Sequence, residues 1–218
     1  MKIPLATIKN CIDRIGKSFS DNAALYFSES DLQSELFCFL LHELPSEGRI
    51  PYTSFWRTQK ESALRPFSSR ALHTEFLLPE GRIDLAILDL DNVTTSVNSR
   101  GRFSHVQLQG GDHVFIEIKA SRTNRSQITS KPTWIKSIRS DIVKLGMYAH
   151  SGFMLCFDFS GILSNTEIEG LKTEAKQNVE VRYFINPYRD HWFHSTETAN
   201  MPCTGQPIKP APSDGRVI

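Results

Sequence analysis

The chain has 218 residues, a formal net charge of +1 and four cysteines. This length fits one domain of ordinary size, and the near-zero charge excludes a strongly basic or acidic protein whose partner could be named from net charge alone. The cysteines are scattered without C-x-x-C spacing, which excludes a zinc ribbon and a disulfide framework. No apolar run reaches the length of a membrane span and the first residues lack a secretory apolar core, so we expect a cytoplasmic protein without a membrane partner.

Pattern and composition divide the chain into three parts. Residues 1–27 are weakly patterned and predict an N-terminal extension with a short helix over residues 5–15, ended by Gly16. Residues 28–186 carry strong periodicity and predict an α/β domain. Residues 187–218 are rich in Pro, Ser and Thr and predict a mobile tail.

Residues 28–44 predict the first helix of the domain. Apolar side chains recur there at helical spacing, Ser30 with Gln33 fits a capping box, and Pro45 ends the pattern. The positions of this apolar stripe are Leu32, Leu36, Phe37, Leu40, Leu41 and Leu44.

Residues 46–70 predict an irregular segment in which cations are interleaved with aromatic side chains. Two interpretations stay open. The aromatic rings anchor a loop in the core, or the segment contacts nucleic acid, with cations on phosphates and rings stacked on bases. The residues concerned are Arg57, Lys60, Arg65, Arg70, Tyr52, Phe55, Trp56 and Phe67.

Strands and helices alternate through the rest of the domain. Residues 71–78 and 82–88 predict a hairpin around a Pro-Glu-Gly turn, and residues 112–119 predict a third strand after a polar connection over 89–111. The later elements are a helix over 134–150, a strand over 153–159, a helix over 166–177 and a strand over 179–185. This order predicts an α/β sandwich, with a central mixed sheet of about five strands flanked by helices.

The third strand carries two charged residues on one face. Glu117 and Lys119 lie two residues apart, and Asp84 lies in the apolar run of the preceding strand. Charged side chains on an apolar strand are costly to bury unless they have a use, and carboxylate oxygens are preferred ligands of Mg²⁺. The sequence therefore predicts a magnesium site. In the alternative, Glu117 and Lys119 form a solvent-facing pair and Asp84 accepts backbone hydrogen bonds at a strand end.

These residues resemble the PD-(D/E)xK nuclease superfamily. The resemblance rests on Asp84, on Glu117-Ile118-Lys119, and on their position between a helix with an early glutamate and the helical stretch 138–145. It extends over about residues 28–160, and it departs from the pattern in that Ile83, rather than proline, precedes the aspartate. It implies the restriction-endonuclease-like fold, a three-layer sandwich.

The resemblance also implies a chemistry. Mg²⁺, with Mn²⁺ as a substitute, would be held by Asp84, Glu117 and the carbonyl of Ile118, and Lys119 would orient the attacking water or stabilise the transition state. The substrate would be a nucleic acid, DNA rather than RNA. Enzymes of this class serve in restriction, repair, recombination or defence, and a second copy, or a helicase or recognition subunit, would select the substrate.

Many members of the superfamily carry a further glutamate on the first helix. Glu29 and Glu35 are the candidates here, and Glu75 on the first strand is a third. We prefer Glu29 because it shares a helix face with Leu32 and Leu36. In the alternative, Glu29 or Glu35 is only an acid at the helix start that interacts favourably with the helix dipole.

Residues 119–144 hold seven lysines and arginines against the single acid Asp141. Such one-sided charge beside the predicted site suits a phosphate backbone, and the alternative is a solvated helix face. The candidate nucleic-acid-binding residues are Arg122, Arg125, Lys136 and Lys144.

Two other functions stay open. The protein is a catalytically weak or inactive nucleic-acid-binding or scaffold protein on the same fold, or it is an unrelated α/β enzyme with an accidental E-x-K sequence. In the second case Asp84 and Glu117 would lie far apart.

Overall fold

The computed structural model describes residues 3–44, 48–50, 52–54, 67–97, 103–124 and 127–186. The contacts of the chain divide it into Met1–Pro187 and Tyr188–Ile218, and all elements below belong to the first unit. The predicted tail and most of the segment 46–70 lie outside the described residues. Within the described part, no helix is both long and apolar enough to cross a bilayer.

A five-stranded mixed sheet forms the centre of the fold. The outer strand β12 and its neighbours β11 and β8 run parallel, whereas β5 is antiparallel to both β8 and β4. β8 and β11 are buried along almost their whole length, as expected for strands that helices cover on both faces. The strands in spatial order are β12 (Val179–Ile185), β11 (Ser151–Asp158), β8 (Val114–Ala120), β5 (Gly81–Ile87) and β4 (Leu72–Leu78).

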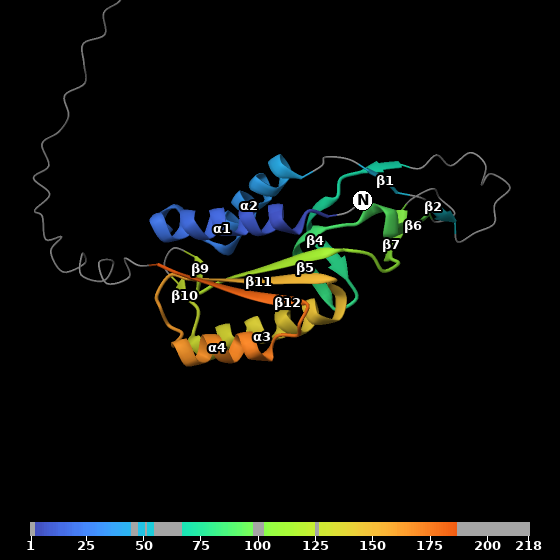
Figure 1. Ribbon diagram of the computed structural model, residues 1–218. Helices are drawn as coiled ribbons and strands as arrows, with labels where there is room; N and C mark the ends of the chain where they lie inside the picture. Colours follow the sequence, from blue (N-terminus) through green and yellow to red (C-terminus); the bar gives the residue numbers. More distant parts are fainter. Residues whose placement is uncertain are drawn as a thin grey trace, which may run out of the picture. The chain divides into compact units, whose positions relative to one another are not determined.

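Four helices pack against this sheet, two on each face (Figure 1). α1 (Leu5–Asp21) and α2 (Glu29–Glu43) cover one face, and α3 (Lys131–Tyr148) and α4 (Asn165–Glu174) cover the other. Each helix buries apolar side chains against the strands. The predicted α/β fold with a mixed sheet of five strands is therefore confirmed.

α2 begins two residues earlier than the predicted capping box. Ser28 is the N-cap, and its backbone N–H donates to the Asp31 carboxylate at 2.9 Å. The predicted box of Ser30 and Gln33 is wrong, and the Gln33 side chain is free for a contact with β5.

α1 is longer than predicted, and Gly16 does not end it. Ile12, Ile15 and Phe19 are fully buried, so the apolar stripe continues past the glycine. A Cβ added to Gly16 would lie 2.1 Å from a ring carbon of Phe184 on β12. The glycine lets α1 approach β12 closely, which is why it is accommodated in the middle of a helix.

The polar connection predicted over residues 89–111 contains regular structure. η3 (Leu90–Asn92) leads into β6 (Val93–Val97), which pairs with β7 (Phe103–Leu108) and with β2 (Tyr52–Ser54) in a second sheet. The sequence pattern did not predict β6 and β7 within this connection, because these strands lack the apolar alternation that marks a half-buried strand. The remaining short strands pair as β1 (Gly48–Ile50) with β3 (Phe67–Ser69) and β9 (Arg122–Asn124) with β10 (Gln127–Ile128).

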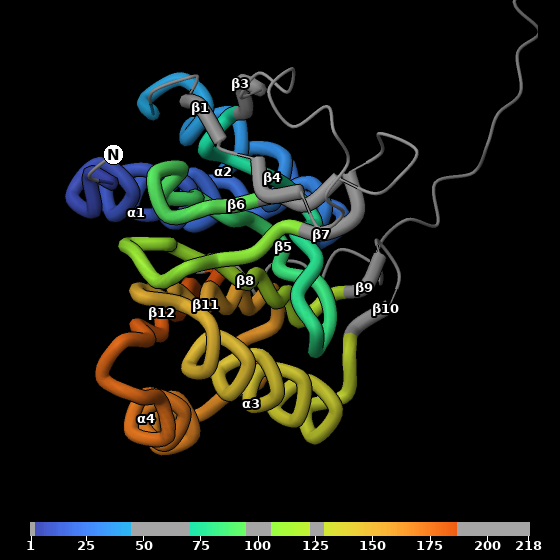
Figure 2. Tube along the Cα trace, turned by 90° about the vertical axis from the view of Figure 1, so that its right-hand side faces the viewer, coloured from blue at the N-terminus to red at the C-terminus, as the bar shows by residue number. Residues whose placement is uncertain are grey.

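The central sheet opens between β5 and β8 at one end. The pairing runs from Ile87 opposite Val114 to Leu85 opposite Ile116, and it stops there. Towards Gly81, β5 is paired with β4, and the end of this hairpin curves away from β8 towards α3 (Figure 2). This opening holds the residues that the sequence singled out.

We expect Gly16→Ala to lower the free energy of unfolding by roughly 1–3 kcal/mol, because its Cβ overlaps the Phe184 ring. Gly170→Ala in α4 is the matched control, since an added Cβ meets no atom within 4 Å there. It should stabilise the protein by about 0.5–1 kcal/mol through helix propensity. Urea unfolding measures both variants, and a Gly16→Ala protein as stable as the wild type would contradict the close packing.

Candidate active site

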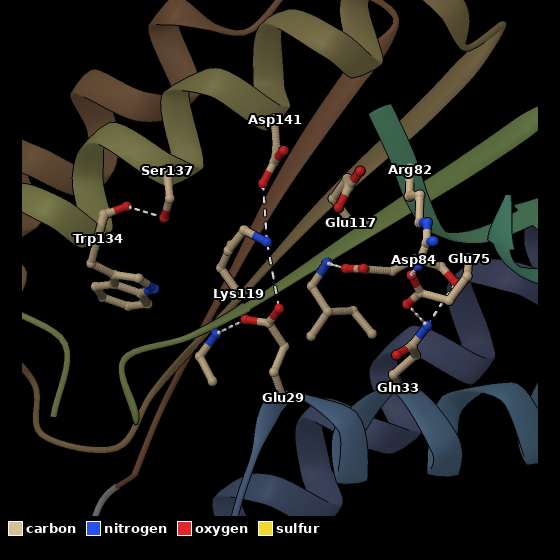
Figure 3. Close-up of polar contacts among 12 residues, drawn as sticks. Glu29, Gln33, Glu75, Arg82, Asp84, Glu117, Lys119, Trp134, Ser137 and Asp141 are labelled. Carbon is tan, nitrogen blue, oxygen red and sulfur yellow. Dashed lines mark hydrogen bonds and ion pairs between the residues drawn. The ribbon is translucent and has the colours of Figure 1, made fainter. Parts of the chain in front are cut away.

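Six charged side chains from four elements meet at the opening between β5 and β8. Figure 3 labels all of them except Lys144. Four carboxyl groups face two ammonium groups, so two negative charges are uncompensated when all six are ionised. We call this group the charge cluster. It consists of Glu29 of α2, Asp84 of β5, Glu117 and Lys119 of β8, and Asp141 and Lys144 of α3.

Asp84 lies at the point where the hydrogen-bond ladder between β5 and β8 stops, and its side chain bonds to the backbone of β8. Its Oδ2 accepts a hydrogen bond from the backbone N–H of Ile118 at 2.7 Å, as the structural alternative for this residue expected. Because the N–H and C=O of a strand residue point to the same side, the carbonyl of Ile118 faces the same opening. The backbone carbonyl of Asp84 accepts a further hydrogen bond from Gln33 Nε2 at 2.8 Å, which ties β5 to α2.

Glu117 lies directly beside Asp84, where the continued register of the two strands would set it. The two carboxyl groups lie near enough to shift each other's pKa, so they are not far apart, as an accidental motif would require. The Glu117 side chain is 2% exposed, and burial, reinforced by the charges of Asp84 and Asp141, raises its pKa to about 9. Burial also raises the pKa of Asp84. The pair therefore favours a proton or an additional cation between its oxygens.

Lys144 is the cation in contact with Glu117. Its Nζ lies 2.5 Å from Glu117 Oε1 and 3.0 Å from Asp141 Oδ1, and it donates a hydrogen bond to the carbonyl of Arg82 at 2.7 Å. The contact with Oε1 is an ion pair that lacks the alignment of a hydrogen bond. Burial lowers the pKa of Lys144, but its contacts with Glu117 and Asp141 outweigh this effect and raise it.

Lys119 lies between carboxylates from opposite helical layers. Its Nζ is 3.2 Å from Asp141 Oδ2 on α3 and 3.5 Å from Glu29 Oε1 on α2. Burial would lower the pKa of Lys119, but Glu29 and Asp141 raise it above its ordinary value. The ammonium group is therefore charged at neutral pH.

Glu29 is the acid of α2 that reaches the charge cluster. Besides its contact with Lys119, it accepts a hydrogen bond from the backbone N–H of Ala120 at 3.1 Å. Glu35 accepts hydrogen bonds from two hydroxyl groups on the side of α1, and Glu75 is half-exposed on β4. Among the described contacts, Glu29 alone of the three candidates is paired with Lys119.

Two residues of the site were missed by the sequence analysis. Asp141 bridges Lys119 and Lys144, and its signal was that it is the single acid in a basic run, three residues before a lysine on one helix face. Gln33 was assigned to the helix cap, and its amide instead joins the Asp84 carbonyl to the Glu75 carboxylate at 2.8 and 3.2 Å.

The strand opposite Asp84 has an unusual backbone. Glu75 on β4 has a φ of 51°, in the left-handed region that residues other than glycine rarely adopt. The pairing of β4 with β5 skips this position, although the register on both sides would set it opposite Asp84. The backbone strain thus coincides with the candidate site, as strain at functional sites often does.

The structure describes three of the four predicted nucleic-acid-binding residues, and these three have different surroundings. Lys144 lies in the charge cluster, and the guanidinium of Arg122 lies over the ring of Phe159 at 4.9 Å. Lys136 is exposed on the side of α3 that faces α4. Arg125 lies outside the described residues. A continuous basic surface over these four residues stays a prediction.

The donor set of the opening fits a hard divalent cation. Asp84 and Glu117 offer carboxylate oxygens from adjacent strands, and the Ile118 carbonyl faces the same space. Burial, together with the neighbouring carboxylates, raises the pKa of both carboxyls, and a divalent cation would offset this effect. The described residues contain no group of three or more His, Cys, Asp or Glu side chains arranged to hold a metal ion. A metal ion here therefore needs the carbonyl and water molecules as further ligands, which suits Mg²⁺.

No family model matches the chain, and no significant match is found among curated proteins or solved structures. What the site can do chemically follows from its own residues. Its carboxyl pair can hold a divalent ion, and the ammonium of Lys119 stands two residues further along the same strand.

We expect Glu117→Gln to stabilise the protein in EDTA at about pH 8. A folded-state pKa of about 9 lies above that of an unfolded glutamate, so the stability that the protonated form contributes is complete at about pH 4 and is lost as the pH rises through 9. Glutamine imitates the protonated carboxyl, so the melting temperature of the variant should fall less with pH and exceed that of the wild type by roughly 2–8 °C.

Differential scanning calorimetry between about pH 5 and pH 9 measures this difference. Glu169→Gln is the matched control, because Glu169 is exposed on α4, and its profile should follow the wild type. If the fall with pH persists unchanged in Glu117→Gln, Glu117 is not its source.

Proposed function

We propose that the protein is a metal-dependent nuclease that hydrolyses phosphodiester bonds, in DNA rather than RNA, with the charge cluster as its active site. One observation carries this proposal: the carboxyl groups of Asp84 and Glu117 lie near each other on adjacent strands, with the charged Lys119 beside them (Figure 3). Carboxylate pairs with an adjacent ammonium group suit a reaction in which negative charge develops on phosphate oxygens.

The order of elements supports a restriction-endonuclease-like fold, which forms part of the proposal. α2 is followed by three strands of the central sheet, β4, β5 and β8, and then by α3 and the parallel strand β11. The resemblance at Asp84 and Glu117-Ile118-Lys119 implies this order, with the acidic residues on the second and third strands.

Each residue of the cluster has a role in the proposed reaction. Asp84, Glu117 and the Ile118 carbonyl would hold Mg²⁺ or Mn²⁺, which when bound makes a coordinated water more acidic and neutralises charge on the scissile phosphate. Lys119 would orient the attacking water or stabilise the transition state. Glu29 would keep Lys119 charged and in place from the α2 side. A second copy of the chain, or a helicase or recognition subunit, would select the substrate.

A second candidate function is a catalytically weak or inactive nucleic-acid-binding or scaffold protein on the same fold. The observation that favours it is the closed state of the site, because the Glu117 side chain is 2% exposed and already has Lys144 as a cationic partner. Such a protein would bind nucleic acid without a requirement for a divalent ion.

We expect the protein to cut DNA with Mg²⁺ or Mn²⁺, and Asp84→Asn and Lys119→Met each to reduce the rate by about 100-fold or more. The assay uses labelled linear, circular and single-stranded DNA, and the circular substrate separates endonuclease from exonuclease action. Lys172→Met is the matched control, because Lys172 is exposed on α4, and it should cut like the wild type. A wild type that shifts DNA in a gel at low salt but cuts none of the substrates would support the second candidate instead.

Glu29→Gln should slow cleavage by about tenfold or more, because it removes one of the two charges that hold Lys119. Glu35→Gln changes the same residue type on the same helix, away from the cluster, and should keep the cleavage rate of the wild type. Single-turnover cleavage rates, measured with melting temperatures to correct for folding, compare the two variants. Equal losses in both would assign no special role to Glu29.

A further inference from the structure

We propose that Lys144 is an internal cation that occupies the carboxylate pair in the metal-free protein, and that a divalent metal ion must displace it from Glu117. The inference rests on the proposed function for the identity of the metal-binding carboxylates. It goes beyond that function because it assigns Lys144 the control of metal entry rather than a place on an exposed nucleic-acid surface.

The contacts of Lys144 are those of a bound cation. Lys144 Nζ has three oxygen partners: it forms ion pairs with Glu117 and Asp141 and donates a hydrogen bond to the carbonyl of Arg82. Its side chain is only 14% exposed, although it lies in a run of cations that would suit a solvated helix face. The side chain is thus placed as a ligand of the cluster.

Lys144 and a metal ion would compete for the same carboxylate. The shortest contact of the ammonium group is the 2.5 Å ion pair with Glu117 Oε1, and Glu117 is one of the two carboxylates available to a metal. Solvent cannot screen the repulsion between two cations at a side chain that is 2% exposed. Binding of the divalent ion is therefore expected to expel the ammonium group.

Lys119 does not play this part. Its ion pairs are with Glu29 and Asp141 rather than with Asp84 or Glu117. Asp141 contacts Lys119 through Oδ2 and Lys144 through Oδ1, so departure of Lys144 leaves the contact with Lys119 intact. The two lysines thus have different roles: Lys119 stays beside the carboxylates, and Lys144 exchanges with the metal ion.

Displacement of Lys144 would also weaken the contact between α3 and the β4–β5 hairpin beside the site. Lys144 ties the β4–β5 hairpin to α3 through the Arg82 carbonyl, and this part of β5 is not paired with β8. Release of the ammonium group would free the hairpin from α3 and leave a positive charge at the rim of the opening. A phosphate group could then reach carboxylates that are closed to solvent in the metal-free state.

The first test measures affinity for Mn²⁺ alone by isothermal titration calorimetry, without DNA. Lys144→Met should bind the ion about tenfold more tightly than the wild type, or tighter still, whereas Lys144→Arg, which keeps the charge, should not gain affinity. Asp84→Asn should lose binding, and Lys172→Met should match the wild type. Equal affinities of Lys144→Met and the wild type would overturn the proposal.

The second test uses the wild-type protein, so it does not depend on the folding of a variant. Acetylation of single lysines, followed by mass spectrometry, is compared in EDTA and in saturating Mn²⁺. Lys144 should react faster in Mn²⁺, and Lys172 should react equally in both. A Lys144 rate that Mn²⁺ leaves unchanged or lowers would overturn displacement, because simple charge repulsion strengthens metal binding in Lys144→Met without exposing Lys144.

The outcomes separate this inference from the proposed function. Metal-dependent exposure of Lys144 without DNA cleavage would support the inference and count against the nuclease. Cleavage without any change at Lys144 would support the nuclease and overturn the inference. Absence of Mn²⁺ binding in every variant would overturn both.

Discussion

The loss of pairing between β5 and β8 is the constraint on which the rest of the site depends. Where a ladder stops inside a protein, the freed backbone groups need other partners, and the Asp84 carboxylate supplies one to the N–H of Ile118. That contact holds the Asp84 carboxylate near Glu117. The negative charge of Glu117 then requires a cation nearby. Lys144 supplies this cation, and Asp141 forms ion pairs with both Lys144 and Lys119. The charge state of each member of the cluster therefore depends on its neighbours.

The charge cluster also joins the two helical layers through the gap in the sheet. Glu29 reaches it from α2 and Asp141 from α3, and both contact the ammonium group of Lys119. A helix layer that shifted would therefore move one carboxylate away from Lys119. Gln33 adds a contact between α2 and the backbone of β5. The position of the proposed catalytic lysine is thus set by the packing of the whole sandwich rather than by its own strand.

The elements of the central domain could be predicted from sequence because their apolar periodicity is strong, and Glu117 and Lys119 could be singled out because charge interrupts an apolar strand. The contacts within the site could not be predicted from the sequence. Whether Asp84 lies opposite Glu117 depends on strand register, and the place of Lys144 depends on the rotation of α3 against the sheet. The end of helix α1 was predicted wrongly, because Gly16 leaves room for the ring of Phe184, a residue far away in the sequence. The strands β6 and β7 pair with each other, and β6 also pairs with β2. Their sequences lack the apolar periodicity from which a strand can be predicted.

The position of the opening has a consequence for how the protein folds. It lies at the junction between a hairpin of neighbouring strands, β4 and β5, and a parallel half in which β8, β11 and β12 are joined by helical crossovers. Local hairpins form early, whereas parallel pairing must first close long loops and is slow. Asp84 belongs to the early part and Glu117 to the late part. The two carboxyl groups therefore meet only when β8 pairs with β5, across a longer connection than the turn within the hairpin.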